Sequence, residues 1–294
     1  MSAKPRRVHS HRLVEKVSAV PADLPELVID RGHSARAPHA GVRQTWRDNH
    51  GRLVATGGHE GQSWWMDWPG LATFRFGEQG PVSAAPVTHN RDVEIRDIFV
   101  RGVLPVVLLA RGCEALHASA VAIDDESVIA LCAISGTGKS SLALAMTASG
   151  ARHFADDTVV YRVVNDRPVA LGLPFPVRVD AAALEAAGRG HRQAQPAAAS
   201  SHLSPLKRVY QLSRDPSGDP FAPQFTAVPC HRRFETLLKH SHPFEMGSDA
   251  RHRAFHEHLL TIAQHTDVWD CRFAPALEAL PSLAAQLVEH AATS

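Results

Sequence analysis

A glycine-rich segment that ends in a lysine and a serine is the part of this sequence best suited to chemistry. It reads Ala133-Ile134-Ser135-Gly136-Thr137-Gly138-Lys139-Ser140, the phosphate-binding pattern GxxxxGK[ST] with alanine at the first glycine position. Glycines let successive backbone N–H groups turn toward a phosphate, the lysine adds a cation, and the serine hydroxyl can bind Mg²⁺. The predicted nucleotide contacts are Ser135, Gly136, Thr137, Gly138, Lys139, Ser140 and Ser141.

Two adjacent carboxylates, Asp156 and Asp157, follow this loop closely enough for the chain to return beside it. In phosphoryl transfer one carboxylate can hold Mg²⁺ while the other accepts the proton of an attacking hydroxyl. The alternative is a turn-forming pair at the surface, but the apolar residues on both sides favour a position beside the phosphates. The pair therefore predicts a metal and proton-transfer site.

The flanking segments predict the elements that bring these residues together. Residues 116–123 and 127–134 are expected to form a β-hairpin, and residues 139–149 a helix that ends at Gly150. A turn centred on Asp125 pairs residue 117 with residue 133, which puts His117 at the mouth of the loop. A register shift of one residue would turn this side chain to the other face. We predict a functional His117, with a structural histidine as the alternative.

Other polar residues are weaker candidates. Arg178 follows a predicted strand and could contact phosphate, with a surface arginine as an equal alternative. His252, His256 and His258 lie on a predicted helix, but no complete metal-ligand pattern includes them. A solvated helix face is therefore expected there.

The composition excludes several classes of protein. The chain has 294 residues, with 31 Lys and Arg against 30 Asp and Glu, so its net charge of +1 gives no electrostatic reason for a nucleic-acid or membrane partner. The richest apolar run, residues 103–110, contains Pro105 and is too short to span a bilayer. Four widely spaced cysteines are expected to be buried thiols in a reducing compartment, which predicts a cytoplasmic protein.

The sequence changes character along its length and predicts three parts. Residues 1–18 are a flexible basic leader, residues 19–94 a small β-rich domain, and residues 95–294 a catalytic α/β domain. The tryptophans at positions 64, 65 and 68 are expected to pack in the β-rich domain rather than form a ligand surface. A helix over residues 95–112 should be broken or kinked near Pro105. Residues 181–205, rich in Ala, Gly, Gln and Ser, are expected to form a short helix and a mobile loop that could act as a lid.

Three segments carry a family resemblance. They are Leu116-His117-Ala118-Ser119-Ala120-Val121, Ile134-Ser135-Gly136-Thr137-Gly138-Lys139-Ser140-Ser141 and Phe154-Ala155-Asp156-Asp157. Together they resemble the catalytic domain of HPr kinase/phosphorylase, and still more the shorter HPr-kinase-like proteins of bacterial peptide-maturation gene clusters. The resemblance is specific over residues 112–165. It implies a P-loop core of the HPr kinase and phosphoenolpyruvate carboxykinase type, with Mg²⁺–ATP as donor and a protein serine as acceptor.

The resemblance also implies a role for each site residue. Lys139 contacts phosphate, Ser140 binds the metal, and His117 lies at the transferring phosphate. Asp156 acts as acid and base, and Asp157 assists the metal. The second signature of the bifunctional family, with its Arg-Asn-Leu-Ala run, has no equivalent in this sequence. Phosphorylase activity, HPr as substrate and the family's hexamer are therefore not implied.

These observations predict an ATP- and Mg²⁺-dependent kinase that phosphorylates a serine of a peptide or small protein, including the precursor of a ribosomal peptide natural product. One alternative is a small-molecule kinase with the same loop and a deep, closed acceptor pocket. Another is a catalytically silent nucleotide-binding protein that regulates a complex. A homo-oligomer is compatible with the sequence, which does not define the assembly.

Overall fold

The chain divides into two compact units. The computed structural model describes residues 24–32, 41–48, 50–124, 127–173 and 203–293. Among these, the first unit runs from Leu24 to Arg111 and the second begins at Gly112. The boundary predicted between residues 94 and 95 is thus displaced, because the helical segment that follows belongs to the first unit. The predicted leader and residues 181–202 of the predicted loop lie outside the described residues, and residues 203–205 belong to a strand.

A six-stranded sheet forms the first unit, in the order β1-β6-β5-β4-β3-β2. Its strands are β1 (Leu27–Ile29), β2 (Val42–Arg47), β3 (Leu53–Glu60), β4 (Ser63–Trp68), β5 (Ala72–Phe76) and β6 (Val82–Pro86). Strands β2 to β6 form an antiparallel meander, and β1 pairs in parallel with β6. The predicted β-rich character of this region is confirmed.

A helical segment completes the first unit. It consists of α1 (Asp92–Ile98), the π-helical turn η1 (Phe99–Val103) and α2 (Leu104–Ala110). The interruption predicted near Pro105 takes this π-helical form, because proline has no N–H to donate to the preceding turn. Gly102 lies against the Trp68 ring, where a Cβ would come within 2.7 Å of a ring carbon. The segment therefore packs closely on strand β4.

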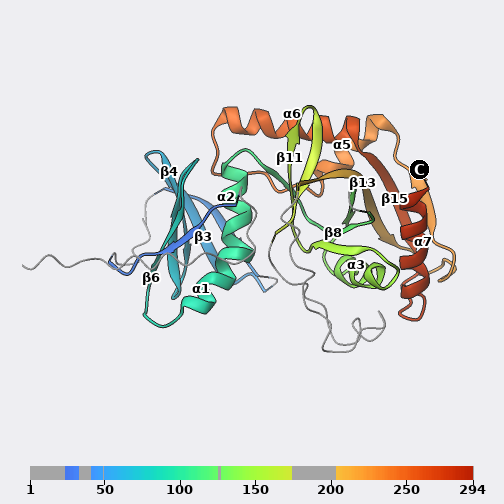
Figure 1. The fold of residues 1–294 in the computed structure, drawn as a ribbon, viewed down its shortest axis with the longest axis horizontal. Helices are drawn as coiled ribbons and strands as arrows, with labels where there is room; N and C mark the ends of the chain where they lie inside the picture. Colours follow the sequence, from blue (N-terminus) through green and yellow to red (C-terminus); the bar gives the residue numbers. More distant parts are fainter. Residues whose placement is uncertain (1–23, 33–40, 49, 125–126, 174–202, 294) are drawn as a thin grey trace, which may run out of the picture. The chain divides into compact units, whose positions relative to one another are not determined.

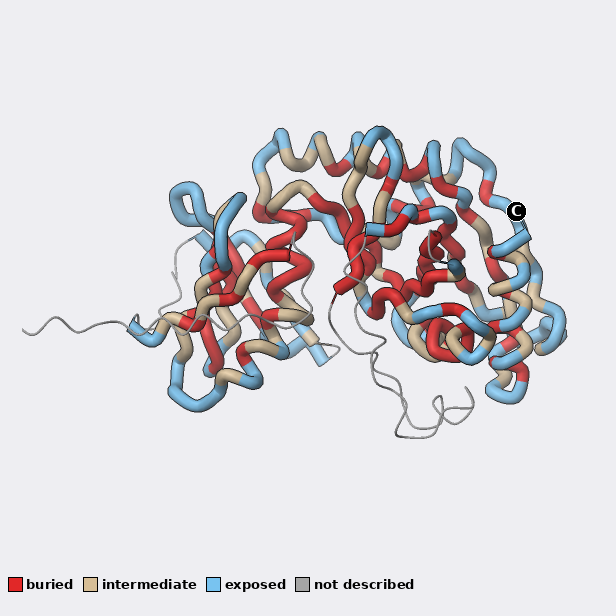
Figure 2. The backbone as a smooth tube through the Cα atoms, in the orientation of Figure 1, coloured by how far each residue is buried: buried red, intermediate tan, exposed pale blue. Residues whose placement is uncertain are grey.

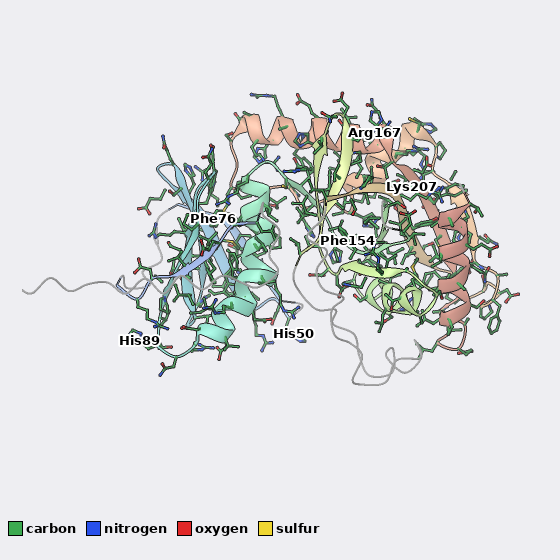
Figure 3. All side chains as sticks on the ribbon, in the orientation of Figure 1. His50, Phe76, His89, Phe154, Arg167 and Lys207 are labelled. Carbon is green, nitrogen blue, oxygen red and sulfur yellow. The ribbon has the colours of Figure 1, made fainter. Side chains whose placement is uncertain are left out.

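The three tryptophans of β4 are packing residues, as predicted. Trp65 is buried. Trp64 stacks on Phe76, with ring centroids 6.2 Å apart, and Phe76 is labelled in Figure 3. Trp68 meets Phe74 edge to face at 5.9 Å. Such aromatic pairs stabilise a small sheet beyond the area they bury.

The second unit is built on a larger, mixed sheet. Its strands are β7 (Glu114–Leu116), β8 (Ala118–Ala122), β9 (Val128–Cys132), β10 (Arg152–Ala155), β11 (Val159–Val164), β12 (Arg167–Leu171), β13 (Leu203–Arg214), β14 (Gln224–Ala227) and β15 (Asp267–Phe273). They follow the order β10-β8-β9-β13-β12-β11-β7, with β15 also paired to β13 and β14 to β15. Strands β9, β13 and β15 are mutually parallel at the centre. The fold is α/β.

Helices cover both faces of this sheet (Figure 1). One face packs against α3 (Lys139–Ala148) and α7 (Leu280–Ala292), and the other against α5 (Cys230–Leu238) and α6 (Asp249–His265). Strand β9 serves both cores, since Ile129 and Leu131 face α3 whereas Ala130 and Cys132 face α6. Strands β8 and β9 are accordingly buried throughout (Figure 2). A strand buried on both faces is a rigid support for the loop that leaves it.

The predicted hairpin register is confirmed. Strands β8 and β9 pair Ala118 with Cys132 and Ala122 with Val128, the register that a turn centred on residue 125 requires. Helix α3 begins at Lys139, and Gly150 follows it with φ +102°, as expected of a helix stop. The strand, loop and helix that the glycine-rich motif needs are all present.

Two further expectations concern the cysteines and membranes. Cys113, Cys132 and Cys271 are buried as predicted, and burial raises the pKa of the Cys132 and Cys271 thiols to about 12. Cys230 is exposed at the start of α5, which corrects the expectation that all four thiols are buried. Among the described residues, no helix is both long and apolar enough to cross a membrane.

Candidate active site

The glycine-rich loop, residues 133–140, connects β9 to α3. Gly136 has φ +81° and Gly138 φ +107°, a left-handed conformation in which a side chain would be strained. A Cβ on Gly136 would meet no atom within 4 Å, so the loop backbone is open at this point. Gly138 is the residue before α3, so the loop leads directly into the positive end of the helix. This arrangement suits an anion with several oxygens.

Lys139 is held at the base of the loop. The residue is only 7% exposed, and its Nζ donates to the Ala133 carbonyl at 3.0 Å. The same Nζ lies 3.0 Å from His117 Nε2. An ammonium group has no acceptor, so Nε2 accepts and the neutral imidazole carries its proton on Nδ1. Burial lowers the pKa of Lys139. The structure thus brings His117 to the loop mouth, as the hairpin register predicted.

Asp156 lies on the other side of the loop, directly after β10. It is 5% exposed, and its Oδ1 accepts hydrogen bonds from Ser140 Oγ at 2.7 Å and from Ser119 Oγ at 2.6 Å. Ser119 is on β8, and sequence reasoning did not single it out. The spacing could have indicated it, because in the strand predicted over residues 116–123 residues 117 and 119 would point to the same side.

Asp157 occupies a different environment from its neighbour. Its side chain is 81% exposed, and its backbone adopts a left-handed φ of +66°. His117 Nδ1 lies 3.1 Å from the Asp157 carbonyl oxygen and 3.6 Å from its carboxylate. The Nδ1–H of His117, deduced above from its contact with Lys139, can therefore donate to the Asp157 carbonyl. The predicted metal hydroxyl, Ser140, contacts Asp156 rather than Asp157.

A segment after α5 forms a third side of the site. The His117 N–H donates to the His240 carbonyl at 2.6 Å, and the His242 N–H donates to the Ala115 carbonyl at 2.9 Å. The rings of His117 and His242 are 5.5 Å apart. Burial, together with the nearby positive charge of Lys139, lowers the pKa of His240 to about 4. No sequence motif marks these two histidines, which reach the site only through the fold.

Gln211 and Asp270 orient His240. Gln211 Nε2 donates to Asp270 Oδ1 at 3.1 Å, so the amide oxygen of Gln211 faces His240 Nε2 at 3.4 Å. These two residues lie opposite each other on the parallel strands β13 and β15. The imidazole of His240 is therefore the tautomer with its proton on Nε2.

Arg214 is another residue that sequence reasoning missed. It ends β13, and its guanidinium donates to the Thr137 carbonyl from Nε at 3.2 Å and to the Gly136 carbonyl from Nη2 at 2.8 Å. It lies 77 residues from Thr137 in the sequence. Only the parallel pairing of β9 with β13 brings it to the loop.

The remaining candidates divide as follows. Ser135 and Gly136 are exposed, Thr137 is buried, and Ser141 is half-buried on the first turn of α3. Arg178 lies outside the described residues. His258 does not lie on a freely solvated face, since its Nδ1 is 2.8 Å from the buried Glu114 carboxylate. His252 Nε2 is 3.2 Å from the Phe244 carbonyl, and His256 remains exposed. The described residues contain no cluster of three His, Cys, Asp or Glu suited to a metal ion.

A nucleotide and Mg²⁺ fit the residues present. Ser140 and Asp156 place a hydroxyl and a carboxylate oxygen 2.7 Å apart, and Mg²⁺ prefers one or two such oxygen ligands together with phosphate oxygens and water. The loop, Lys139 and the start of α3 suit the phosphates.

A cavity of about 440 Å³ lies elsewhere in the second unit. Its lining includes Ser127 just before β9 and Asp267 at the start of β15, together with Lys207 within β13 and Arg167 at the start of β12. Arg167 and Lys207 are labelled in Figure 3. The glycine-rich loop follows the other end of β9, and no predicted site residue within the described part of the chain lines this cavity.

Comparisons with known proteins give little further information. No protein-family model matches the chain, and no curated protein matches it. Among solved structures, the HPr(Ser) kinase/phosphatase from Coxiella burnetii is similar with a TM-score of 0.35 and 15% sequence identity. The match covers 60% of this chain and 95% of that chain. A likeness at this TM-score supports no conclusion about shared activity.

Proposed function

We propose that this chain is a kinase with an HPr-kinase-like P-loop core, which transfers the γ-phosphate of Mg²⁺–ATP to a serine hydroxyl of a peptide or small protein. The observation that carries the proposal is the convergence of Lys139, Ser140, Asp156 and His117 on one glycine-rich loop. The family resemblance of these residues supplies the serine acceptor. The buried thiols and the use of ATP favour a cytoplasmic location.

The loop and Lys139 would bind and neutralise the phosphates. The backbone N–H groups at the start of α3 supply fixed positive ends, and the buried ammonium of Lys139 adds a cation that needs no reorganisation. Bound Mg²⁺ would add positive charge against the β- and γ-phosphate oxygens. His117 keeps the ammonium in place by accepting from it at 3.0 Å.

The two aspartates would divide the remaining work. We assign Asp156 to the metal side, together with Ser140, because their oxygens are 2.7 Å apart, and Asp156 is buried while Ser140 is half-buried. Asp157 is exposed and adjacent to His117, so an acceptor hydroxyl that arrives from solvent can reach it. Asp157 is therefore the base in this proposal. The division is the reverse of the one that the family resemblance implies.

The direct test is phosphate transfer by the full chain. The purified protein is incubated with Mg²⁺, ATP and a serine-containing peptide encoded beside its gene, and the peptide is analysed by mass spectrometry. The proposal predicts a gain of about 80 Da on serine, which a Ser→Ala peptide should not show. Transfer only to a small hydroxyl compound would establish the small-molecule kinase instead, and ATP binding without transfer would favour the regulatory protein.

The loop assignment has its own test. We expect Lys139→Ala to weaken Mg²⁺–ATP binding by about tenfold or more, because a charge-assisted contact to phosphate is lost. Calorimetry on the purified chain measures the affinity. Lys239→Ala is the matched control, since that lysine is exposed and pairs with Glu235. Equal affinities of the Lys139→Ala variant and the unmodified protein would contradict the assignment.

A further inference from the structure

Arg214 contacts the glycine-rich loop in a way that the proposed function leaves unexplained. Its guanidinium does not point at a carboxylate, but bridges two consecutive carbonyls of the loop, those of Gly136 and Thr137. The fork of a guanidinium matches such a pair of acceptors because its donors have a fixed geometry. The contact therefore restrains two peptide planes at once.

These two peptides are the part of the loop most able to change conformation. They lie between Gly136 and Gly138, the residues with φ of +81° and +107°. Glycine permits both signs of φ at little cost, so either peptide plane could turn over without steric strain. A turned plane would direct a carbonyl, rather than an N–H, toward a bound anion. The contact of Arg214 with both carbonyls, which we call the brace, selects one of the two orientations of these peptides.

The orientation selected is the one that an anion needs. In a trans peptide the C=O and the following N–H point in opposite directions. Fixing the carbonyls of Gly136 and Thr137 toward Arg214 therefore directs the N–H groups of Thr137 and Gly138 to the opposite side of the loop. In the structure the Thr137 N–H donates to the Ile134 carbonyl at 3.3 Å, a long bond that a phosphate oxygen would have to replace.

The sheet provides the rigid support for this brace. Strand β13 pairs with β9 up to Gln211 and Cys132, then continues to Arg214 beside β15. Since β9 ends where the loop begins, the extension of β13 carries Arg214 past the loop. The anchor is a central strand rather than another loop.

We propose that Arg214 is a positioning residue that holds the glycine-rich loop in its phosphate-binding conformation from the outer side. The inference rests on the proposed function for the identity of the anion, ATP. It does not make Arg214 a phosphate ligand, because its Nε and Nη2 donors are engaged by the two carbonyls.

The experiment compares three variants of the full chain. Arg214→Ala removes the brace, Arg214→Lys keeps the charge without the fork, and Arg272→Ala removes an exposed arginine from the neighbouring strand, where it lies 4.0 Å from Asp215. We expect Arg214→Ala to weaken Mg²⁺–ATP binding by about tenfold, with KM affected more than kcat. Arg214→Lys should recover little of this loss, and Arg272→Ala should bind as the unmodified protein does.

A second readout separates this inference from the proposed function. Amide hydrogen exchange of the loop peptide, measured without nucleotide, should accelerate in Arg214→Ala, while exchange in β9 and α3 stays unchanged. Unchanged loop exchange would overturn the inference even if the protein binds ATP. Full recovery of affinity by Arg214→Lys, or an equal loss in Arg272→Ala, would also overturn it by showing that charge alone matters. Faster loop exchange in a protein that does not bind ATP would support the brace and refute the proposed function.

Discussion

Two buried carboxylates in the second unit have very different surroundings. Glu114, on the short strand β7, is fully buried, and Asp156 is 5% exposed beside the glycine-rich loop. Moving a carboxylate out of water costs several kcal/mol unless its oxygens find good partners. The type of partner that each has found indicates what each residue does.

The partners of Glu114 hold its carboxylate in a fixed geometry. Arg251 of α6 contacts both carboxylate oxygens at 2.8 Å, and His258 Nδ1 lies 2.8 Å from one of them. The interaction joins β7 to α6 across 137 residues of sequence. A planar guanidinium leaves the carboxylate little capacity for anything else. This is the arrangement of a structural ion pair.

The hydroxyl donors of Asp156 can be exchanged. Ser119 and Ser140 direct their hydroxyl hydrogens to one oxygen of Asp156, and hydroxyl groups rotate easily. On arrival of a cation, Ser140 can turn its hydrogen away and offer a lone pair instead. A carboxylate held by rotatable hydroxyls is suited to chemistry, whereas one held by a guanidinium fork is suited to stability.

The largest expected effect is on stability at Glu114. We expect Glu114→Gln to lower the free energy of unfolding by about 3 kcal/mol, because the buried charge of Arg251 loses its counterion. Denaturant titration measures the loss. Glu257→Gln, an exposed site on α6, is the control and should change stability by less than about 0.5 kcal/mol. A neutral result at Glu114 would remove the contrast between the two carboxylates.

A slightly smaller effect, on activity, is expected at the aspartate pair. Asp156→Asn should reduce transfer by about a hundredfold or more, equivalent to about 2.7 kcal/mol, while its oxygen still accepts from both serines. It should also weaken the dependence on Mg²⁺. Asp157→Asn should reduce transfer by about a hundredfold with Mg²⁺–ATP affinity unchanged.

These two variants distinguish the possible divisions of labour. Metal titrations at fixed ATP, followed by single-turnover transfer, separate binding from chemistry. If Asp156→Asn keeps its metal dependence and Asp157→Asn loses it, the roles are those that the family resemblance implies. If Asp156→Asn instead unfolds the protein as Glu114→Gln should, the contrast between the two sites is wrong.

Ser119 and His258, which each contact one of the two buried carboxylates, should show the same contrast between activity and stability on a smaller scale. Ser119→Ala and His258→Ala each remove one hydrogen bond to a buried carboxylate, so each should cost about 1 kcal/mol of stability. Only Ser119→Ala should also lower transfer, because Asp156 is then less well oriented. Thermal melting measures the loss of stability, and kinetics measures the loss of transfer. Equal activity losses in both variants would indicate a general destabilisation of the fold.

At neutral pH the smallest expected effect is at His240, because this effect develops only as the pH is lowered. Its pKa falls from 6.5 to about 4 on folding, since burial and the nearby Lys139 disfavour its charged form. The unfolded chain therefore binds more protons between these values, so this contribution to stability is complete above pH 6.5 and declines as the pH is lowered toward 4. His240→Gln should flatten that decline, measured as unfolding midpoints across the range. An unchanged slope would show that burial does not shift the pKa of His240.

Much of this site followed from local sequence. The glycines and Lys139 define a loop between a strand and a helix by their conformational freedom and charge, and the alternation of β8 and β9 set the register that puts His117 beside the loop. Strand alternation with a short turn is determined by neighbouring residues alone. For the same reason the interruption near Pro105 and the packing of the β4 tryptophans were predictable.

Other features depended on which distant segments meet, and no local pattern carries that information. The helical segment over residues 92–110 joins the first unit because Gly102 accommodates Trp68, which moves the boundary from the predicted residue 94 to Arg111. His258, expected at a solvated face, meets Glu114 only because α6 packs across β7.

The amino-acid sequence by itself determined which reactive groups are available, since a lysine, three serines, two aspartates and a histidine at fixed spacings can be identified without a structure. Only the tertiary structure decided how that chemistry is arranged. It placed Asp156 against Ser140 and Asp157 in solvent, and it brought His240 and Arg214 to the loop from elements far along the chain. The reason is physical: burial, hydrogen-bond partner and charge environment belong to the packed sheet, and they decide what each residue type can do.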